Sequence, residues 1–399
     1  MPEDKQSTVT TAPAQAPTTP ASQTAVARNP PKAPAIPAEP SMVVSSSPHF
    51  HTAFTVNKIM FWVIIALLPG CLAGIYFFGL DALRVLLLTT VSCVVFEYLA
   101  ARLMKKSIDV TDGSAAVTGL LLAMNLPAST PIWMCLLGAF IAIVLGKMIY
   151  GGLGCNPFNP ALVGRIALLV GCAGAMNTFT QPRVPESMLR KDAIVSQLQE
   201  EVTTPLEPVT GPTPLAFSKQ ARTDQNAEDI MTNLAYSLNY QEPLSYGKLF
   251  LGIGKGGSLG ETCGLALLVG VILLIALHIV RWQIPLCFLG TVAIITGVAW
   301  AVNPQAYATP LFHLLTGGLL LGAFFMATDL VTTPLSRTGA IIFAVGCGIL
   351  TSCIRLWGSY PDGTSFAILI MNAFTPLIDR YTKSRPFGMP KQKGLHFAK

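Results

Sequence analysis

The sequence predicts an all-α integral membrane protein of about ten transmembrane helices, and three observations lead to this prediction. Of its 399 residues, 52% are hydrophobic and only 12% are charged, about half the charged fraction of an average soluble domain. Several apolar runs approach the roughly 20 residues that a helix needs to cross a bilayer. The 34 Gly and 30 Pro residues interrupt these runs repeatedly. The pattern excludes a soluble globular enzyme, a coiled coil and a disulfide scaffold.

The apolar segments divide the chain into five parts. Residues 1–41 are rich in Pro, Ala, Thr and Ser, and we expect a disordered tail because this composition cannot offset the entropy of ordering. Five helices are expected over 42–176, a polar stretch over 177–262, five more helices over 263–380 and a basic tail over 381–399. The ten expected helices are residues 59–79, 83–101, 114–126, 131–150, 160–176, 263–280, 284–302, 311–327, 339–357 and 364–380.

Matching sequences indicate that the two sets of helices are copies of one repeat. The third and eighth segments are short and contain Gly, which predicts broken helices that face protein or a cavity; both carry Thr-Gly before an aliphatic run, at 118–119 and 316–317. Residues 156–162 (NPFNPAL) resemble 372–378 (NAFTPLI) in the fifth and tenth segments. A repeat of five crossings places its second copy upside down. Chance similarity among apolar segments is the alternative.

The distribution of Lys and Arg predicts the orientation, because these residues accumulate in short cytoplasmic loops. With the first helix starting inside, the cytoplasmic ends hold Arg102, Lys105, Lys106, Lys147, Arg281, Arg337, Arg380, Lys383 and Arg385, and Arg84 and Arg355 are exceptions at external ends. The opposite loop 303–310 is uncharged. We therefore expect both termini in the cytoplasm and the polar stretch 177–262 in the periplasm, across a bacterial inner membrane.

Three further classes of site are not expected. The formal charge of +6 comes from residues at helix ends, so no nucleic-acid surface is predicted. Nine Cys stand singly, without the spacing of a zinc or iron–sulfur site. Residues 252–257 match G-x-G-x-x-G, but no βαβ unit surrounds them and a membrane helix follows. Direct binding of NAD is therefore rejected.

Acidic residues in or beside apolar segments are candidates for an ion path, since a charge is expensive there. Asp329, Glu97 and Asp379 are the candidates, and Asp362 lies in a similar position. The alternative for the aspartates is that they cap helix ends beside arginines. The alternative for Glu97 is a partner on a neighbouring helix.

A Gly/Pro turn in the polar stretch, Thr210-Gly-Pro-Thr213, is expected to present a Thr hydroxyl to solvent. Taken alone, it is ordinary loop chemistry. It belongs to a series of motifs that follow one another along the chain: Ser46-Ser-Pro-His49, residues 150–164 (YGGLGCNPFNPALVG), Thr213-Pro-Leu215, Gly257-Ser-Leu-Gly-Glu261, His313-Leu-Leu-Thr-Gly-Gly318, Phe325-Met-Ala-Thr-Asp329 and Tyr360-Pro-Asp-Gly363.

On these motifs the chain resembles, over about residues 42–390, the RnfD family, the D subunits of the Rnf complex, which is an ion-translocating ferredoxin:NAD oxidoreductase. It resembles the B subunit of the sodium-translocating NADH:quinone reductase less closely. The resemblance implies FMN linked through its phosphate to Thr213 and installed outside the membrane by a flavin transferase. Here the motif reads Thr-Gly-Pro-Thr where the family has Ser-Gly-Ala-Thr, and Thr210 is the neighbouring alternative. A second, noncovalent flavin is also implied, at contacts that the sequence does not place.

The resemblance further implies the fold of ammonium and urea transporters and a role in carrying electrons. The chain would relay electrons through FMN while Na⁺ or H⁺ crosses the membrane, together with the A, B, C, E and G subunits of the Rnf complex. It would not catalyse the overall reaction alone, and we assign it no catalytic residue. Two alternatives stay open: the B subunit of the quinone reductase, and a solute channel or transporter that shares the inverted repeat.

Overall fold

The computed structural model describes residues 55–105, 110–182, 210–211, 213–224, 230–237, 243–253 and 255–383. The predicted tail 1–41 and most of the basic tail 381–399 lie outside these residues. All ten predicted apolar segments are helical in the part described. Each begins and ends within a few residues of its predicted bounds, because Pro and Gly interrupt the apolar pattern at the same places.

The first five segments form helices that start at recognisable capping residues. Thr55 caps α1 by accepting from the Lys58 amide, and Asn159 caps α5 with Pro160 at its first position, as is typical of helix starts. The elements are α1 (Val56–Phe78), α2 (Leu80–Leu103), the short η1 (Val110–Asp112), α3 (Ser114–Met124), α4 (Ile132–Phe140), its continuation as the π-helix η2 (Ile141–Met148), α5 (Pro160–Gly171) and α6 (Ala173–Met176).

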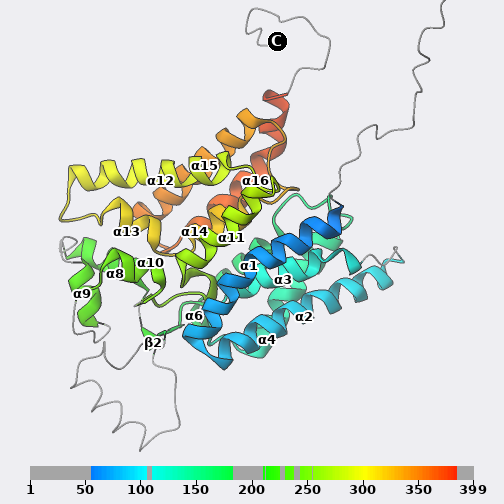
Figure 1. Ribbon diagram of the computed structural model, residues 1–399, viewed down its shortest axis with the longest axis horizontal. Coiled ribbons are helices and arrows are strands. Elements are labelled where there is room, and N and C mark those ends of the chain that lie inside the picture. The colour runs from blue at the N-terminus through cyan, green and yellow to red at the C-terminus, as the bar shows by residue number, and fades with distance from the viewer. Residues whose placement is uncertain are drawn as a thin grey trace, which may run out of the picture. The chain divides into compact units, whose positions relative to one another are not determined.

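The polar stretch contains helices of its own in the part described. Two-residue strands β1 (Phe179–Thr180) and β2 (Thr210–Gly211) pair antiparallel. The remaining elements are α8 (Pro214–Thr223), α9 (Ile230–Ser237), α10 (Tyr246–Leu251) and the 3-10 turn η4 (Leu259–Glu261). Helices α8, α9 and α10 share a small hydrophobic cluster with α13, and these four helices lie together in Figure 1.

The second five segments begin with α11 (Gly264–Ala276) and end with α16 (Thr364–Tyr381). The predicted break in the eighth segment is present: α13 ends at Leu315, and a new helix begins at Leu319. Between them Gly317 adopts a φ of +71°, which a glycine reaches without strain. The other elements are α12 (Gln283–Val302), α13 (Pro310–Leu315), α14 (Leu319–Leu321), the π-helix η5 (Gly322–Met326) and α15 (Arg337–Trp357).

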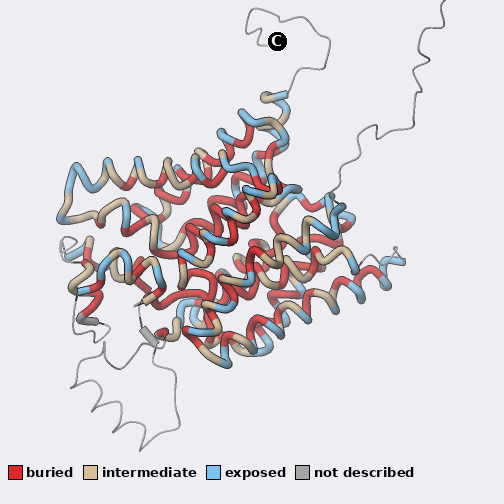
Figure 2. Tube along the Cα trace, viewed as in Figure 1, coloured by how far each residue is buried: buried red, intermediate tan, exposed pale blue. Residues whose placement is uncertain are grey.

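Length and composition show that this is a multi-pass membrane protein. Among the described residues, α1, α2, α12 and α15 are each long and apolar enough to cross a membrane. Large apolar side chains such as Leu72, Val91 and Ile294 are exposed on these helices. Figure 2 shows exposed and half-buried residues along the outer sides of α2 and α12. Such faces suit contact with lipid, since a bilayer accepts apolar surface that water would not.

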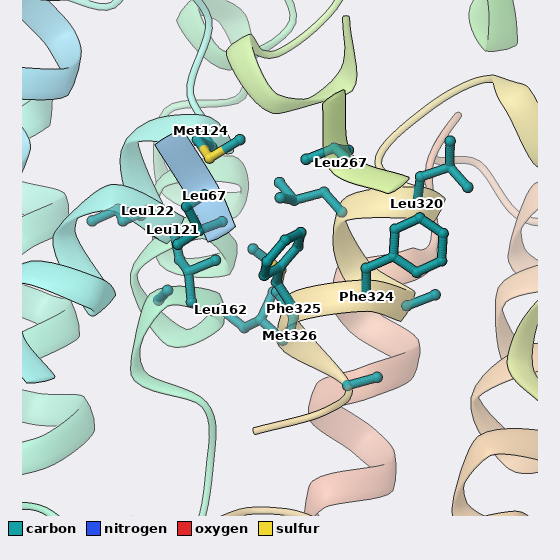
Figure 3. Close-up of a cluster of buried hydrophobic side chains, with 14 of the residues drawn as sticks. Leu67, Leu121, Leu122, Met124, Leu162, Leu267, Leu320, Phe324, Phe325 and Met326 are labelled. Atoms are coloured by element: carbon teal, nitrogen blue, oxygen red, sulfur yellow. The ribbon is translucent and has the colours of Figure 1, made fainter. Parts of the chain in front are cut away.

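The core joins the two sets of helices. Helix α1 packs against α11, and α16 packs against α5. Figure 3 shows side chains of α1, α3, α5, α11, α14 and η5 converging on one buried cluster, labelled Leu67, Leu121, Leu122, Met124, Leu162, Leu267, Leu320, Phe324, Phe325 and Met326. The short central helices α3 and α14–η5 therefore lie inside the protein, between the longer outer helices.

Candidate functional site

Thr213 lies at a cavity between the polar stretch and both sets of helices, which we call the Thr213 cavity. It encloses about 550 Å³ of empty space, including the part open to solvent. Its lining residues are Asn125, Arg165, Leu169, Met176, Asn177, Phe179, Thr213, Leu215, Glu261, Gly317, Tyr360, Pro361 and Asp362.

Thr213 is the N-cap of α8, and its side chain is buried. Its Oγ1 accepts a hydrogen bond from the Ala216 amide at 3.2 Å, and Pro214 occupies the first helical position. Only 9% of the residue is exposed. The expectation that the turn presents this hydroxyl to solvent is therefore wrong. The local Thr-Pro signal starts a helix, and the docking of that helix buries its start.

Two cations dock α8 onto the end of α15. Lys219 Nζ donates to the Gly358 carbonyl at 2.6 Å and to the Tyr360 carbonyl, and Arg222 donates to the Leu356 carbonyl. The carbonyls at a helix C-terminus attract cations. Burial, together with the nearby Arg222 charge, lowers the pKa of Lys219. The contact holds α8 against residues that lie next to the wall of the Thr213 cavity.

Removing both cations is expected to loosen α8 without unfolding the membrane helices. In Lys219→Met/Arg222→Met, amide hydrogens of 214–223 should exchange severalfold faster, because local opening depends on few contacts. Hydrogen exchange with mass spectrometry measures this. Arg281→Met is the matched control, since Arg281 also donates to carbonyls, those of Pro334 and Leu335. Unchanged exchange in 214–223 would contradict the docking role.

Thr210, the neighbouring candidate, belongs to a strand pair. It lies opposite Thr180 in the β1–β2 ladder. Its side chain lies outside the described part of the structure. The backbone of Thr210 nevertheless has a structural role, because it pairs with β1 three residues before Thr213.

A cluster of buried charges lies beside the Thr213 cavity, and three of its members, Arg165, Glu261 and Asp362, line the cavity. Arg165 Nη2 lies 3.6 Å from Glu261 Oε1 and 3.7 Å from Asp362 Oδ2. Arg355 Nη2 lies 2.9 Å from Asp362 Oδ1. All four side chains are at most 13% exposed. Lys255, 1% exposed, interacts electrostatically with three of them. We call Arg165, Lys255, Glu261, Arg355 and Asp362 the charge cluster.

The carboxyls of the cluster differ in their ionisation, because burial and the neighbouring Asp362 charge raise the pKa of Glu261. Burial opposes ionisation of Asp362, but the Arg355 and Arg165 guanidinium groups outweigh it and lower the pKa of that carboxyl to about 2. Burial lowers the pKa of Lys255 to about 8, against the attraction of Glu261, so most of this amine stays protonated at pH 7. Asp362 also accepts from the Gly318 amide at 3.1 Å, which fixes the start of α14.

Sequence reasoning named Asp362 only as a secondary candidate and did not single out Arg165 or Lys255. A signal for Arg165 existed, because a charge inside an apolar segment is expensive whatever its sign. Arg165 is such a charge, in the middle of α5. Lys255 carried no such signal, because it lies in a polar, Gly-rich stretch.

A second cavity lies at the other ends of α3 and α5, and we call it the Asp329 cavity. It encloses about 760 Å³ of empty space, including the part open to solvent. Its polar lining includes Ser114, Thr118, Lys147, Asn156, Asn159, Thr328 and Asp329, and apolar side chains such as Val63, Leu274 and Phe325 complete it. Buried amides and hydroxyls among apolar walls suit a planar ligand that is polar at its edges.

The three ion-path candidates lie in different surroundings. Glu97 forms a buried pair with Lys147 of η2, Nζ to Oε1 2.5 Å, which is the alternative of a partner on a neighbouring helix. Asp329 lines the Asp329 cavity and accepts from Thr332 Oγ1 at 3.2 Å. Asp379 accepts from the Leu335 amide at 3.0 Å, a capping contact. Lys147, the partner of Glu97, lines the same cavity as Asp329.

Most of the chain is similar to one family of proteins. Residues 43–388 match the family described as NQR2, RnfD, RnfE. The chain is 41% identical over 345 residues to the D subunit of the proton-translocating ferredoxin:NAD(+) oxidoreductase complex of Clostridium ljungdahlii, covering 86% of this chain and 96% of that protein. It is 40% identical over 354 residues to the D subunit of the Na(+)-translocating complex of Acetobacterium woodii, covering 88% and 97%. The D subunit of the ion-translocating oxidoreductase complex of Escherichia coli is 36% identical over 365 residues, covering 87% and 99%.

Proposed function

The chain belongs to the NQR2, RnfD, RnfE family, and from this membership we propose that it is the D-type membrane subunit of an ion-translocating ferredoxin:NAD⁺ oxidoreductase. Its relatives carry that name over nearly their whole length. The chain is a translocase component of electron transport and carries no catalytic residue of its own. Its partners are the A, B, C, E and G subunits of the same complex, and the lipid bilayer.

The observation that carries the proposed mechanism is the position of Thr213 at the wall of a cavity that the buried Arg165, Glu261 and Asp362 also line. We propose that FMN is attached to the Thr213 hydroxyl as a phosphoester, because only a hydroxyl can form that bond. The flavin supplies one- and two-electron exchange when attached. Burial of Thr213 and the docked helix α8 hold the attachment point in place and limit access of water.

A noncovalent flavin is the second proposed cofactor, and the Asp329 cavity is its proposed site. The lining amides of Asn156 and Asn159 can hydrogen-bond a ring edge, and Phe325 offers an aromatic face. Arg165 at the Thr213 cavity lies six positions after Asn159 at this cavity along α5, roughly 9 Å at the helical rise. Cofactors in the two cavities would therefore be close enough to exchange electrons through the protein.

We also propose that the ten helices form two inverted repeats. Corresponding residues support this: Lys147 ends the fourth helix of the first set, Arg355 ends the fourth helix of the second set, and each binds a buried carboxylate. The two matched sequence motifs also meet in the structure, where α5 packs against α16.

The proposed setting is a bacterial inner membrane, with both termini cytoplasmic and the polar stretch periplasmic. A flavin transferase on the periplasmic side attaches FMN to Thr213. The coupled ion is Na⁺ or H⁺, because one relative is named for protons and another, equally similar, for Na⁺. The proposed groups on its path are Asp329, which lines the Asp329 cavity together with Lys147, Glu97, which pairs with Lys147, and Asp379.

The test is flavin fluorescence in a denaturing gel, which removes every noncovalent flavin. The full chain co-expressed with a flavin transferase should give a fluorescent band, and Thr213→Val should give none. Thr213→Ser should retain fluorescence, because it keeps a hydroxyl. Thr210→Val is the matched control and should keep the signal. A fluorescent Thr213→Val band, or a dark wild-type band beside a modified control substrate, would overturn the attachment at Thr213.

A further inference from the structure

A short series of hydrogen bonds connects the Thr213 cavity with the Asp329 cavity. Asn125 lines the first cavity, and its Nδ2 donates to Met326 Sγ at 3.7 Å. The carbonyl of Met326 accepts from Asn159 Nδ2 at 3.4 Å, and Asn159 lines the second cavity. Met326 is 1% exposed and lies in the core that Figure 3 shows. One residue and its two hydrogen bonds therefore join the linings of the two cavities.

The Asn125 amide is held in one orientation by three partners. Besides the sulfur of Met326, its Nδ2 donates to the Leu121 carbonyl at 2.6 Å, and its Oδ1 accepts from Arg165 Nη1. Asn125 is 1% exposed, and a buried polar network that is fully hydrogen-bonded rigidifies the protein around it. The amide therefore contacts Met326 and Arg165 at the same time, and Arg165 also lines the Thr213 cavity.

The π-helix η5 gives Met326 a covalent connection to the second cavity. It ends at Met326, and π-turns are frequent at functional sites. The Met326 side chain contacts Asn125 at the wall of the Thr213 cavity, while the preceding residue, Phe325, lines the Asp329 cavity. The peptide bond between Phe325 and Met326 therefore joins the two sides, in addition to the hydrogen bond from Asn159.

We propose that Asn125 and Met326 form a bridge through which an electron passes between the cofactor attached at Thr213 and the flavin of the Asp329 cavity. The inference rests on the proposed function, which assigns a flavin to each cavity. Electron tunnelling falls steeply with distance, and covalent bonds and hydrogen bonds carry it better than gaps between atoms. One electron leaves one flavin and enters the other, and no bond in the bridge forms or breaks. The two residues thus set the rate of transfer and leave the potentials of the flavins unchanged.

Met326→Leu tests the bridge, since it removes the sulfur acceptor and keeps the backbone carbonyl that Asn159 binds. The exchange of Met for Leu conserves volume and is well tolerated in cores. After a laser pulse reduces the full chain loaded with both flavins, transient absorption should show severalfold slower equilibration between them in Met326→Leu and in Asn125→Leu. Met124→Leu is the matched control, because Met124 is buried in the same core, and it should keep the wild-type rate.

Flavin content and midpoint potentials separate the bridge from a merely structural role. Both should equal the wild-type values in Met326→Leu, so that only the rate changes. A wild-type rate in Met326→Leu and Asn125→Leu overturns the inference. A slower rate that accompanies shifted potentials also counts against it, because the altered driving force then explains the change.

A second measurement needs no cofactor. In the chain expressed without a flavin transferase, the losses of thermal midpoint from Asn125→Leu and Met326→Leu should be non-additive, because both variants remove the same contact. Losses from Asn125→Leu and Met148→Leu should add, since Met148 belongs to a separate core cluster. Additive losses for the first pair overturn the bridge. The failure of the proposed function has a different signature, a dark band in the denaturing gel, which this cycle does not affect.

Discussion

Replacing Lys147 by methionine is expected to lower the free energy of unfolding by about 3–5 kcal/mol, because it leaves the Glu97 carboxylate buried and unpaired. The Lys147 Nζ lies 2.5 Å from Glu97 Oε1 and equally close to Ser114 Oγ. The two charged side chains are 2% and 8% exposed. The second carboxylate oxygen of Glu97 has no partner among the described residues, so no other group takes over when the amine is removed.

A double-mutant cycle separates the pair from the packing around it. Lys147→Met and Glu97→Gln should each lower the thermal midpoint in detergent, and the double variant should recover most of the loss, because it leaves no buried charge. Asp81→Asn is the matched control. It breaks the exposed pair with Arg84, and such pairs contribute about 0–1 kcal/mol. A Lys147→Met protein as stable as the wild type would contradict the expectation.

The helices were predictable because their signals are local. Apolar composition marks each segment, and the residues that start and stop helices stand at its ends. Asn159-Pro160 and Thr309-Pro310 each place a capping side chain before a proline at the first helical position. The break before Leu319 follows from Gly317, whose positive φ is reached without strain only by glycine.

The surroundings of Thr213 were not predictable from the same signals. The polarity of the stretch suggested that Thr213 is exposed to solvent. Helix α8 instead docks through Lys219 and Arg222 onto carbonyls more than 130 residues away in the chain. Nothing in a local pattern indicates which carbonyls a cation will reach. Arg165, Glu261 and Asp362 meet for the same reason, since long-range packing alone brings three separate segments to one cavity.

The pair of Glu97 and Lys147 shows a further limit. Lys147 lies on the π-helix η2, which continues α4. A π-turn shifts the register of the following side chains relative to an α-helix, so an α-helical pattern alone does not locate the Lys147 side chain. The sequence therefore indicated that Glu97 needs a partner or a function, and the backbone geometry decides which residue supplies the partner.

Gly270→Leu is the second variant with a large expected effect, because Gly270 lies where α11 crosses α1. A Cβ atom at this position would overlap the Ala66 carbonyl oxygen and would lie 3.0 Å from the Phe325 ring. Small residues let membrane helices approach this closely. Even Gly270→Ala should force the helices apart and cost about 1–3 kcal/mol, the range for overpacking, and leucine should prevent stable packing.

The measurement is the yield of monodisperse protein in detergent and its thermal midpoint. Gly290→Ala in α12 is the matched control: its new Cβ meets nothing within 4 Å, and replacing a helical glycine by alanine gains up to about 1 kcal/mol. Because Val63 of α1 and Leu274 of α11 both line the Asp329 cavity, separating these helices should also release the proposed noncovalent flavin while the covalent one stays attached. A Gly270→Ala protein that keeps wild-type stability would show that the α1–α11 contact can open without cost. Retention of both flavins would show that flavin binding in the Asp329 cavity does not depend on this contact.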